Sequence, residues 1–184
     1  MKIIIVGPGA MGCLFAGMLC RAGHEVWVLA RDEAQAALIR ERDICIETAG
    51  DILHLPRTVI TAAPEHIGVA DIVLVCVKAY DTHAALKHAL PAISRETTVV
   101  TLQNGLGNIE ILCQEVAPEQ VLAGTTAHGA TRISTWHVRH ADLGVVLGFR
   151  QVARGPAEQS RGAGATRELM LAALEALQNL QGPL

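Results

Sequence analysis

A glycine-rich segment directly after a short apolar run is the feature that most constrains this chain. The run Ile3–Val6 consists of β-branched residues without polar alternation, which is typical of a strand covered on both faces in a parallel sheet. Gly7, Gly9 and Gly12 follow it in the pattern Gly-x-Gly-x-x-Gly, and a helical spacing of apolar residues begins immediately afterwards. This order of strand, glycine-rich turn and helix predicts a loop that binds the phosphates of a dinucleotide.

Each glycine has its own task in such a loop. Gly7 permits the tight turn, Gly9 lets a pyrophosphate approach the backbone, and Gly12 allows the helix to pack closely on the strand. The unpaired N–H groups of the first helical turn then hold the phosphates. The competing interpretation is a purely structural turn. We expect the cofactor-binding loop to comprise six consecutive residues: Gly7, Pro8, Gly9, Ala10, Met11 and Gly12.

The residue after the second predicted strand bears on which dinucleotide is bound. The strand Glu25–Ala30 is followed by Arg31, whose guanidinium can form bidentate bonds to a 2′-phosphate. An acidic residue at this place would instead bind a free ribose 2′-hydroxyl. We therefore expect NADP(H) as the cofactor. The alternative is that Asp32 turns inward to bind NAD while Arg31 is a solvated surface charge.

Apolar runs and helical segments alternate along most of the chain, which is typical of an α/β protein with a parallel sheet. Further strands are expected at Asp71–Val77, Thr97–Leu102 and Val121–Ala130, and helices at Glu33–Arg42, Thr82–Leu90 and Ile109–Val116. We predict a doubly wound α/β fold of the Rossmann type, with a mainly parallel sheet built on four parallel strands and right-handed crossovers.

Four shorter segments are expected outside this basic plan. Trp136–Val138 and Gly144–Leu147 are interpreted as antiparallel strands that close the sheet at one edge. Ile44–Ile46 and Ile52–Leu55 flank a turn and predict a small hairpin beside the sheet.

The length of 184 residues is consistent with one compact domain. We assign residues 1–164 to a dinucleotide-binding domain. Residues 165–184 are assigned to the terminal helix of the same domain, because Ala165–Leu180 carries one apolar face.

Composition excludes several classes of protein. Lys and Arg number 15 against 18 Asp and Glu, a net charge of −3, which excludes a basic nucleic-acid binder. The five cysteines form no CxxC pair, so neither a metal site nor a disulfide framework is expected. Gly7-Pro8-Gly9 interrupts the apolar N-terminus, and no window offers the roughly 20 apolar residues of a membrane span. We expect a soluble, cytoplasmic protein.

Three further segments carry a resemblance to a known family: Val77-Lys78-Ala79-Tyr80, the stretch Leu102–Glu110 with the sequence LQNGLGNIE, and Gly124–Ala130 with the sequence GTTAHGA. Together with the glycine-rich loop, they resemble ketopantoate reductase (2-dehydropantoate 2-reductase) over about residues 1–150. That family reduces ketopantoate to pantoate with NADPH in the synthesis of pantothenate and coenzyme A.

The resemblance implies roles for four residues. It places Arg31 on the 2′-phosphate, Lys78 beside the nicotinamide and substrate as an auxiliary catalytic group, and Asn104 on the nicotinamide ribose and the substrate. It places Ala130 near the cofactor. Each lies at the carboxyl end of a predicted parallel strand, where open α/β sheets bind ligands. Taken alone, Lys78 could be a solvated charge and Asn104 part of a simple turn. The histidines His128 and His140 are interpreted as structural.

In that family a helical second domain supplies the general-acid lysine and asparagines that bind substrate, and no position of this sequence matches those residues. We expect the chain to bind NADP(H), with a small 2-oxo acid as the family's substrate, and to turn over little or not at all by itself. Exposed apolar surface would favour a homodimer. The alternatives are another two-domain NAD(P)-dependent 2-hydroxyacid or glycerol-3-phosphate dehydrogenase, or a non-catalytic NADP-sensing module.

Overall fold

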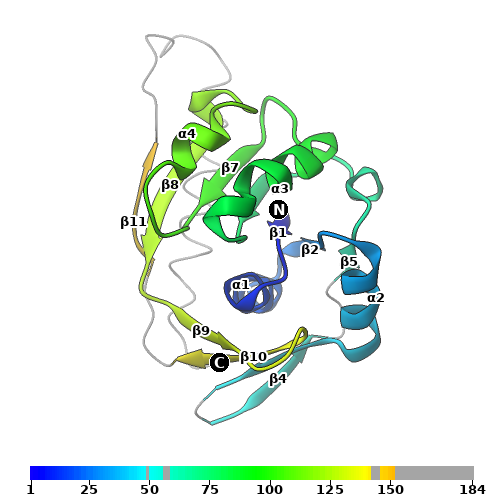
Figure 1. The fold of residues 1–184 in the computed structure, drawn as a ribbon. Coiled ribbons are helices and arrows are strands. Elements are labelled where there is room, and N and C mark those ends of the chain that lie inside the picture. The colour runs from blue at the N-terminus through cyan, green and yellow to red at the C-terminus, as the bar shows by residue number, and fades with distance from the viewer. Residues whose placement is uncertain (49, 56–58, 142–145, 152–184) are drawn as a thin grey trace.

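Two β-sheets with a helix between them make up the described part of the molecule (Figure 1). A computed structural model describes residues 1–48, 50–55, 59–141 and 146–151. The terminal helix expected at Ala165–Leu180, and with it the assignment of residues 165–184, lies outside the described residues.

The larger sheet is mainly parallel. Its strands are β1 (Lys2–Val6), β2 (Glu25–Leu29), β5 (Val59–Thr61), β6 (Ile72–Val75), β7 (Thr98–Thr101), β8 (Val121–Thr126) and β11 (Val146–Gln151). They lie in the order β11-β8-β7-β6-β1-β2-β5. Within the described ranges six of them run parallel, and β11 pairs with β8 in the antiparallel direction at the edge. The predicted Rossmann-type fold is confirmed, with two more parallel strands than expected.

Helices cover both faces of this sheet. They are α1 (Ala10–Arg21), α2 (Glu33–Arg42), α3 (Thr82–Ala89) and α4 (Asn108–Leu112). Four single 3₁₀ turns are also present in the described residues: η1 (Pro64–His66), η2 (Ala79–Asp81), η3 (Leu90–Ala92) and η4 (Pro118–Gln120). Helices α3 and α4 lie on one face and α1 on the other (Figure 1). Throughout these ranges, no helix has the length and apolarity needed to cross a membrane.

A second, four-stranded sheet packs on the far side of α1. It consists of β3 (Ile44–Glu47), β4 (Ile52–Leu55), β9 (Gly129–Arg132) and β10 (His137–Ala141), in the order β4-β3-β10-β9. The predicted hairpin of β3 and β4 is therefore present. However, it is extended by β10, which pairs with β3 in parallel.

The expectation that Trp136–Val138 closes the main sheet is wrong. His137 and Val138 belong to β10, which pairs with β3 and β9 in the second sheet. The other expected edge strand, Gly144–Leu147, is confirmed in its described part: β11 begins at Val146 and pairs antiparallel with β8, while Gly144 and Val145 lie outside the described residues. A strand pattern specifies alternation of faces but not which sheet the strand will join.

Enclosure between two sheets explains the composition of α1. All residues from Gly12 to Leu19 are buried, so the helix is apolar on every side rather than on one stripe. A Cβ atom on Gly17 would lie 2.1 Å from Cδ1 of Ile46 on β3. The absence of a side chain at Gly17 therefore lets the second sheet approach the helix closely.

The remaining differences concern element boundaries. The strand expected over Val121–Ala130 is divided into β8 and β9, and the chain passes from one sheet to the other at Ala127 and His128. The three-residue strand β5 was not predicted, and α4 ends at Leu112, well before Val116.

Candidate functional site

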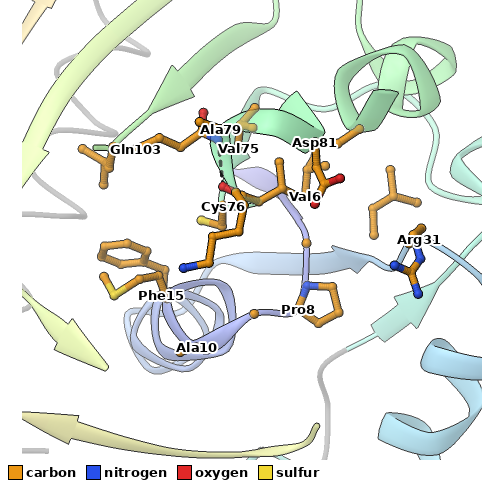
Figure 2. A pocket seen from close by; sticks show the side chains of 18 of the residues that line it. Val6, Pro8, Ala10, Phe15, Arg31, Val75, Cys76, Ala79, Asp81 and Gln103 are labelled. Carbon is orange, nitrogen blue, oxygen red and sulfur yellow. Dashed lines mark hydrogen bonds between the residues drawn. The ribbon is translucent and has the colours of Figure 1, made fainter. Parts of the chain in front are cut away.

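A cleft of about 1030 Å³ opens along the carboxyl ends of the parallel strands. This volume is at the upper end of the roughly 300–1,000 Å³ range of cofactor sites. From β1 the chain builds the sheet outward in one direction through β2 to β5. From β6, which pairs with the other side of β1, it builds outward in the opposite direction through β7 to β8, so the strand order reverses between β1 and β6. Open α/β sheets bind ligands at such a reversal of strand order. Figure 2 shows Pro8 of the loop after β1 between Ala10, at the start of α1, and Arg31 at one end of the cleft.

The glycine-rich loop is held in a conformation that only glycine adopts easily. Gly7 has φ of 99°, and its N–H donates to the carbonyl oxygen of Leu29 at 3.0 Å. A Cβ on Gly7 would lie 2.5 Å from Cγ1 of Val77. At Gly9, by contrast, the nearest atom to an added Cβ is the carbonyl oxygen of Cys76 at 3.8 Å. Gly9 thus leaves space on the cleft side of the loop that protein atoms do not fill.

The first turn of α1 presents an uncompensated positive end to the cleft. Gly9 occupies the N-cap position without a side chain to bond the helical N–H groups, and the first turn carries no acidic residue. The first N–H donor that α1 satisfies within its own backbone is that of Cys13, bonded to the carbonyl oxygen of Gly9 at 2.9 Å. Free N–H groups and the helix dipole make this turn suited to an anion.

Arg31 and Asp32 have separate environments after β2. Arg31 lines the cleft, and its side chain is 87% exposed. Asp32 caps α2: its Oδ1 accepts from the N–H of Gln35 at 2.9 Å, and its Oδ2 accepts from Nε of Arg31 at 3.1 Å. These two hydrogen bonds hold the pKa of Asp32 below its usual value, and the bond from the Gln35 backbone has the larger effect. The carboxylate of Asp32 therefore binds the N-terminus of α2, and Asp32 does not line the cleft.

Gln103 fixes the loops after β6 and β7 to each other. Its Nε2 donates to the carbonyl oxygen of Val77 at 2.7 Å (Figure 2). The same Nε2 donates to Oγ1 of Thr82 at 2.9 Å, and Oε1 of Gln103 accepts from Oγ1 of Thr101 at 2.9 Å. The next residue after Val77, Lys78, is exposed and lines the cleft. The bonds of Gln103 therefore set the backbone position from which Lys78 projects.

Asn104 also lines the cleft. It is exposed, and its carbonyl oxygen accepts from Nδ2 of Asn108 at 3.2 Å. This bond from the buried first residue of α4 holds the loop after β7 in place.

Phe15 of α1 and His128 of the loop between β8 and β9 both line the cleft and contact each other. The rings of Phe15 and His128 meet edge to face with centroids 6.0 Å apart, and Nδ1 of His128 lies 3.2 Å from Nε2 of His140. Burial, and to a smaller extent the charge of His140, lowers the pKa of His128.

The two cysteines near the cleft are protonated at neutral pH. Burial raises the pKa of the Cys13 thiol to about 12 and raises that of the Cys76 thiol further.

The structure brings nearly all predicted site residues to this cleft. Those that line it are Gly7, Pro8, Gly9, Ala10, Met11, Arg31, Lys78, Asn104 and Ala130. Gly12 is buried behind the loop, where an added Cβ would lie 2.0 Å from the carbonyl oxygen of Gly7 and 3.2 Å from Cγ2 of Ile5. Gly12 thus serves helix–strand packing, the task expected of the third glycine.

Sequence reasoning missed several lining residues: Phe15, Gln35, Asp81, His88, Gln103 and Arg132. Gln103 could have been found, because it directly follows a predicted strand. The others come from helix flanks and from the second sheet, and no local motif marks them. In the part of the chain that the structure describes, no group of three or more His, Cys, Asp or Glu side chains is arranged to hold a metal ion.

The strand order and the glycine-rich turn at the strand reversal define a Rossmann-type α/β domain. Its sequence matches the family model of ketopantoate reductase PanE/ApbA over residues 3–148, and the chain therefore belongs to the ketopantoate reductase family. It is 36% identical over 144 residues to 2-dehydropantoate 2-reductase of Halobacterium salinarum, covering 78% of this chain and 47% of that protein. The enzyme of Vibrio cholerae is 34% identical over 156 residues, covering 85% and 47%. The chain spans about half the length of these relatives.

Solved structures agree with this assignment. 2-Dehydropantoate 2-reductase of Geobacter metallireducens superposes with a TM-score of 0.73 at 28% identity, covering 92% of this chain and 56% of that one. A ternary structure of D-mandelate dehydrogenase with NADH and anilino(oxo)acetate gives a TM-score of 0.78 at 26% identity, covering 93% and 55%.

Proposed function

We propose that the chain binds NADP(H) in the cleft, with the Gly7–Gly12 loop on the diphosphate and Arg31 on the 2′-phosphate. The observation that carries this proposal is that the two charged residues after β2 have different environments. Asp32 is occupied as the cap of α2, whereas Arg31 is exposed at the end of the cleft. A guanidinium there favours a phosphorylated ribose over a free hydroxyl.

We infer that the chain is the N-terminal part of a 2-dehydropantoate 2-reductase, which reduces ketopantoate to pantoate in pantothenate and coenzyme A synthesis. The bound cofactor supplies the hydride. Lys78 and Asn104 follow β6 and β7 and line the same cleft, where they would orient the nicotinamide and the 2-oxo acid. A proton donor for the developing alkoxide is also required. The resemblance assigns that donor to a second domain, so we expect little or no turnover from residues 1–184.

A second candidate is favoured by one of the structural neighbours. D-Mandelate dehydrogenase has the same fold and was solved with NADH and an oxo-acid ligand. A reductase of another 2-oxo acid that uses NADH is therefore the alternative.

Titration of the purified chain with NADPH and NADH tests the cofactor, using the change in coenzyme fluorescence. We expect tighter binding of NADPH, and equal affinity for both would remove the NADP proposal. Turnover is then assayed with ketopantoate and with phenylglyoxylate, the 2-oxo acid that corresponds to mandelate. Sustained reduction of ketopantoate by this chain would contradict the expected need for a further proton donor, and preference for phenylglyoxylate with NADH would favour the second candidate.

We also propose a cytoplasmic location and a homodimer. The five cysteines form no disulfide with one another, which suits a reducing compartment. Large apolar side chains such as Tyr80 and Leu106 are exposed, at 84% and 102% of their reference areas. Sedimentation velocity over a range of concentrations tests the dimer, and a monomer at all concentrations would exclude it.

A further inference from the structure

Arg132 is a cation of the cleft that comes from the second sheet. It is the last residue of β9, it is exposed, and it lines the same cleft as the glycine-rich loop. Figure 1 shows β9 crossing below α1, on the side opposite the main sheet. The cleft is therefore bordered by the loop after β1 on one side and by Arg132 on the other.

The alternation of side chains along β9 directs Arg132 toward α1. Residues two apart on a strand project from the same face, so Ala130 and Arg132 share one. Ala130 packs against the apolar cluster that contains the buried α1 residues Cys13, Leu14 and Phe15. The charge of Arg132 also reaches the thiol of Cys13, the fourth residue of α1, where it opposes the rise in pKa caused by burial. Both observations place the guanidinium near the first turns of α1.

The charges that line the cleft are unbalanced. Among the described lining residues, Arg31, Lys78 and Arg132 are cations and Asp81 is the acidic member. Arg31 already donates its Nε to Asp32. The Arg132 side chain forms no hydrogen bond or ion pair with any described residue, so its guanidinium is available to a ligand.

We propose that Arg132 binds the diphosphate of the dinucleotide from the side opposite the glycine-rich loop, so that this group lies between the N-terminus of α1 and the guanidinium. The proposal rests on the proposed function, because it assigns a further binding residue to the same cofactor. The other anionic groups are closer to other cations: Arg31 follows β2, where the 2′-phosphate is expected, and Lys78 follows β6, where substrate is expected. Arg132 is the lining cation that lies near the first turns of α1, where the diphosphate is expected.

The test compares Arg132→Gln with Arg31→Gln in titrations with NADPH and NADH. The diphosphate is common to both coenzymes. Loss of Arg132 should therefore weaken both by the same factor, about 10-fold for one charge-assisted interaction. Loss of Arg31 should weaken NADPH alone. Arg95→Gln is the matched control, because Arg95 is exposed, does not line the cleft and precedes β7 at the opposite end of the strand.

Further ligands and variants separate the possible outcomes. ADP-ribose retains the diphosphate without the nicotinamide, so Arg132→Gln should weaken it to the same extent, and Arg132→Lys should restore part of the affinity. Unchanged affinities for NADPH, NADH and ADP-ribose in a folded Arg132→Gln protein would overturn the proposal and leave the proposed function intact. A loss confined to NADPH would reassign Arg132 to the 2′-phosphate. If the unmodified chain binds neither coenzyme, the proposed function itself fails.

Discussion

An added Cβ on Gly12 would lie 2.0 Å from the carbonyl oxygen of Gly7, so the helix and the loop that precedes it touch backbone to backbone. Gly12→Ala must displace one of them. Overpacking of this kind costs about 1–3 kcal/mol. We expect the variant to lose stability in that range and to lose NADPH binding as well. Urea denaturation and coenzyme titration measure the two effects, and an unchanged denaturation midpoint would show that the contact can relax freely.

Gly9→Ala should affect binding without the same loss of stability. Gly9 has φ of −78°, and no atom lies closer than 3.8 Å to its added Cβ. The weaker N-cap costs no more than about 1 kcal/mol. The methyl group would occupy the space in which the diphosphate is expected, so NADPH affinity should fall at least about 10-fold, equivalent to 1.4 kcal/mol. Wild-type affinity in this variant would argue against contact between the loop and the cofactor.

Arg31 and Asp32 should have separable roles although they are adjacent. Arg31→Ala removes an exposed guanidinium, so it should reduce the preference for NADPH over NADH and leave stability nearly unchanged. Asp32→Ala removes the cap of α2 and should lower the free energy of unfolding by about 1 kcal/mol, with the coenzyme preference retained. If Asp32→Ala instead weakened NADH selectively, the acidic residue would be the ribose ligand.

Gln103→Leu should loosen the junction between the loops after β6 and β7. The change leaves the carbonyl oxygen of Val77 and Oγ1 of Thr82 without their donor, at a cost of about 1–3 kcal/mol. Because Val77 precedes Lys78, affinity for NADPH should fall as well. Gln114→Leu is the control, since Gln114 is exposed and no hydrogen bond of its side chain to a described residue is recorded. Equal urea midpoints for the two variants would show that the bonds of Gln103 contribute nothing.

The stability of the fold should decrease in acid partly because of His128. Burial, with the nearby His140, lowers the folded-state pKa of His128 below its ordinary value of about 6.5. The unfolded chain therefore takes up this proton more readily, and stability falls as the pH drops below about 6.5. His128→Gln should show a smaller loss of thermal stability between pH 7.5 and 5.5 than the unmodified chain. Parallel curves would mean that another group titrates.

Much of the main sheet follows from local sequence. Ile3–Val6 has no polar face to expose, so this strand must lie between two layers. The glycines after it predict a tight turn into the following helix. The sheet that β10 joins could not be predicted from local sequence, because the residues His137–Ala141 are compatible with a strand in either sheet. Its pairing with β3 joins His137 to Cys45, which lies 92 positions earlier in the sequence, and only the assembled chain specifies it.

The site was predictable where a strand delivers its residue directly. Arg31, Lys78 and Asn104 follow β2, β6 and β7, and the fold gathers strand ends without further information. Phe15 and Arg132 were not predictable in this way. Phe15 faces the cleft from the flank of α1. Arg132 reaches it from the second sheet, of which the sequence predicted only the hairpin of β3 and β4.

The pairing of β3 with β10 also has a consequence for biosynthesis. During translation, α1 and its glycine-rich turn emerge from the ribosome long before the strand that completes the layer beneath them. A nascent chain that ends before His137 would hold α1 against a second sheet that still lacks β10. Apolar side chains that share a core cluster with Val138, such as Phe15, would then lack part of their cover. Such an intermediate would expose apolar surface of the kind that makes partly folded chains prone to aggregation.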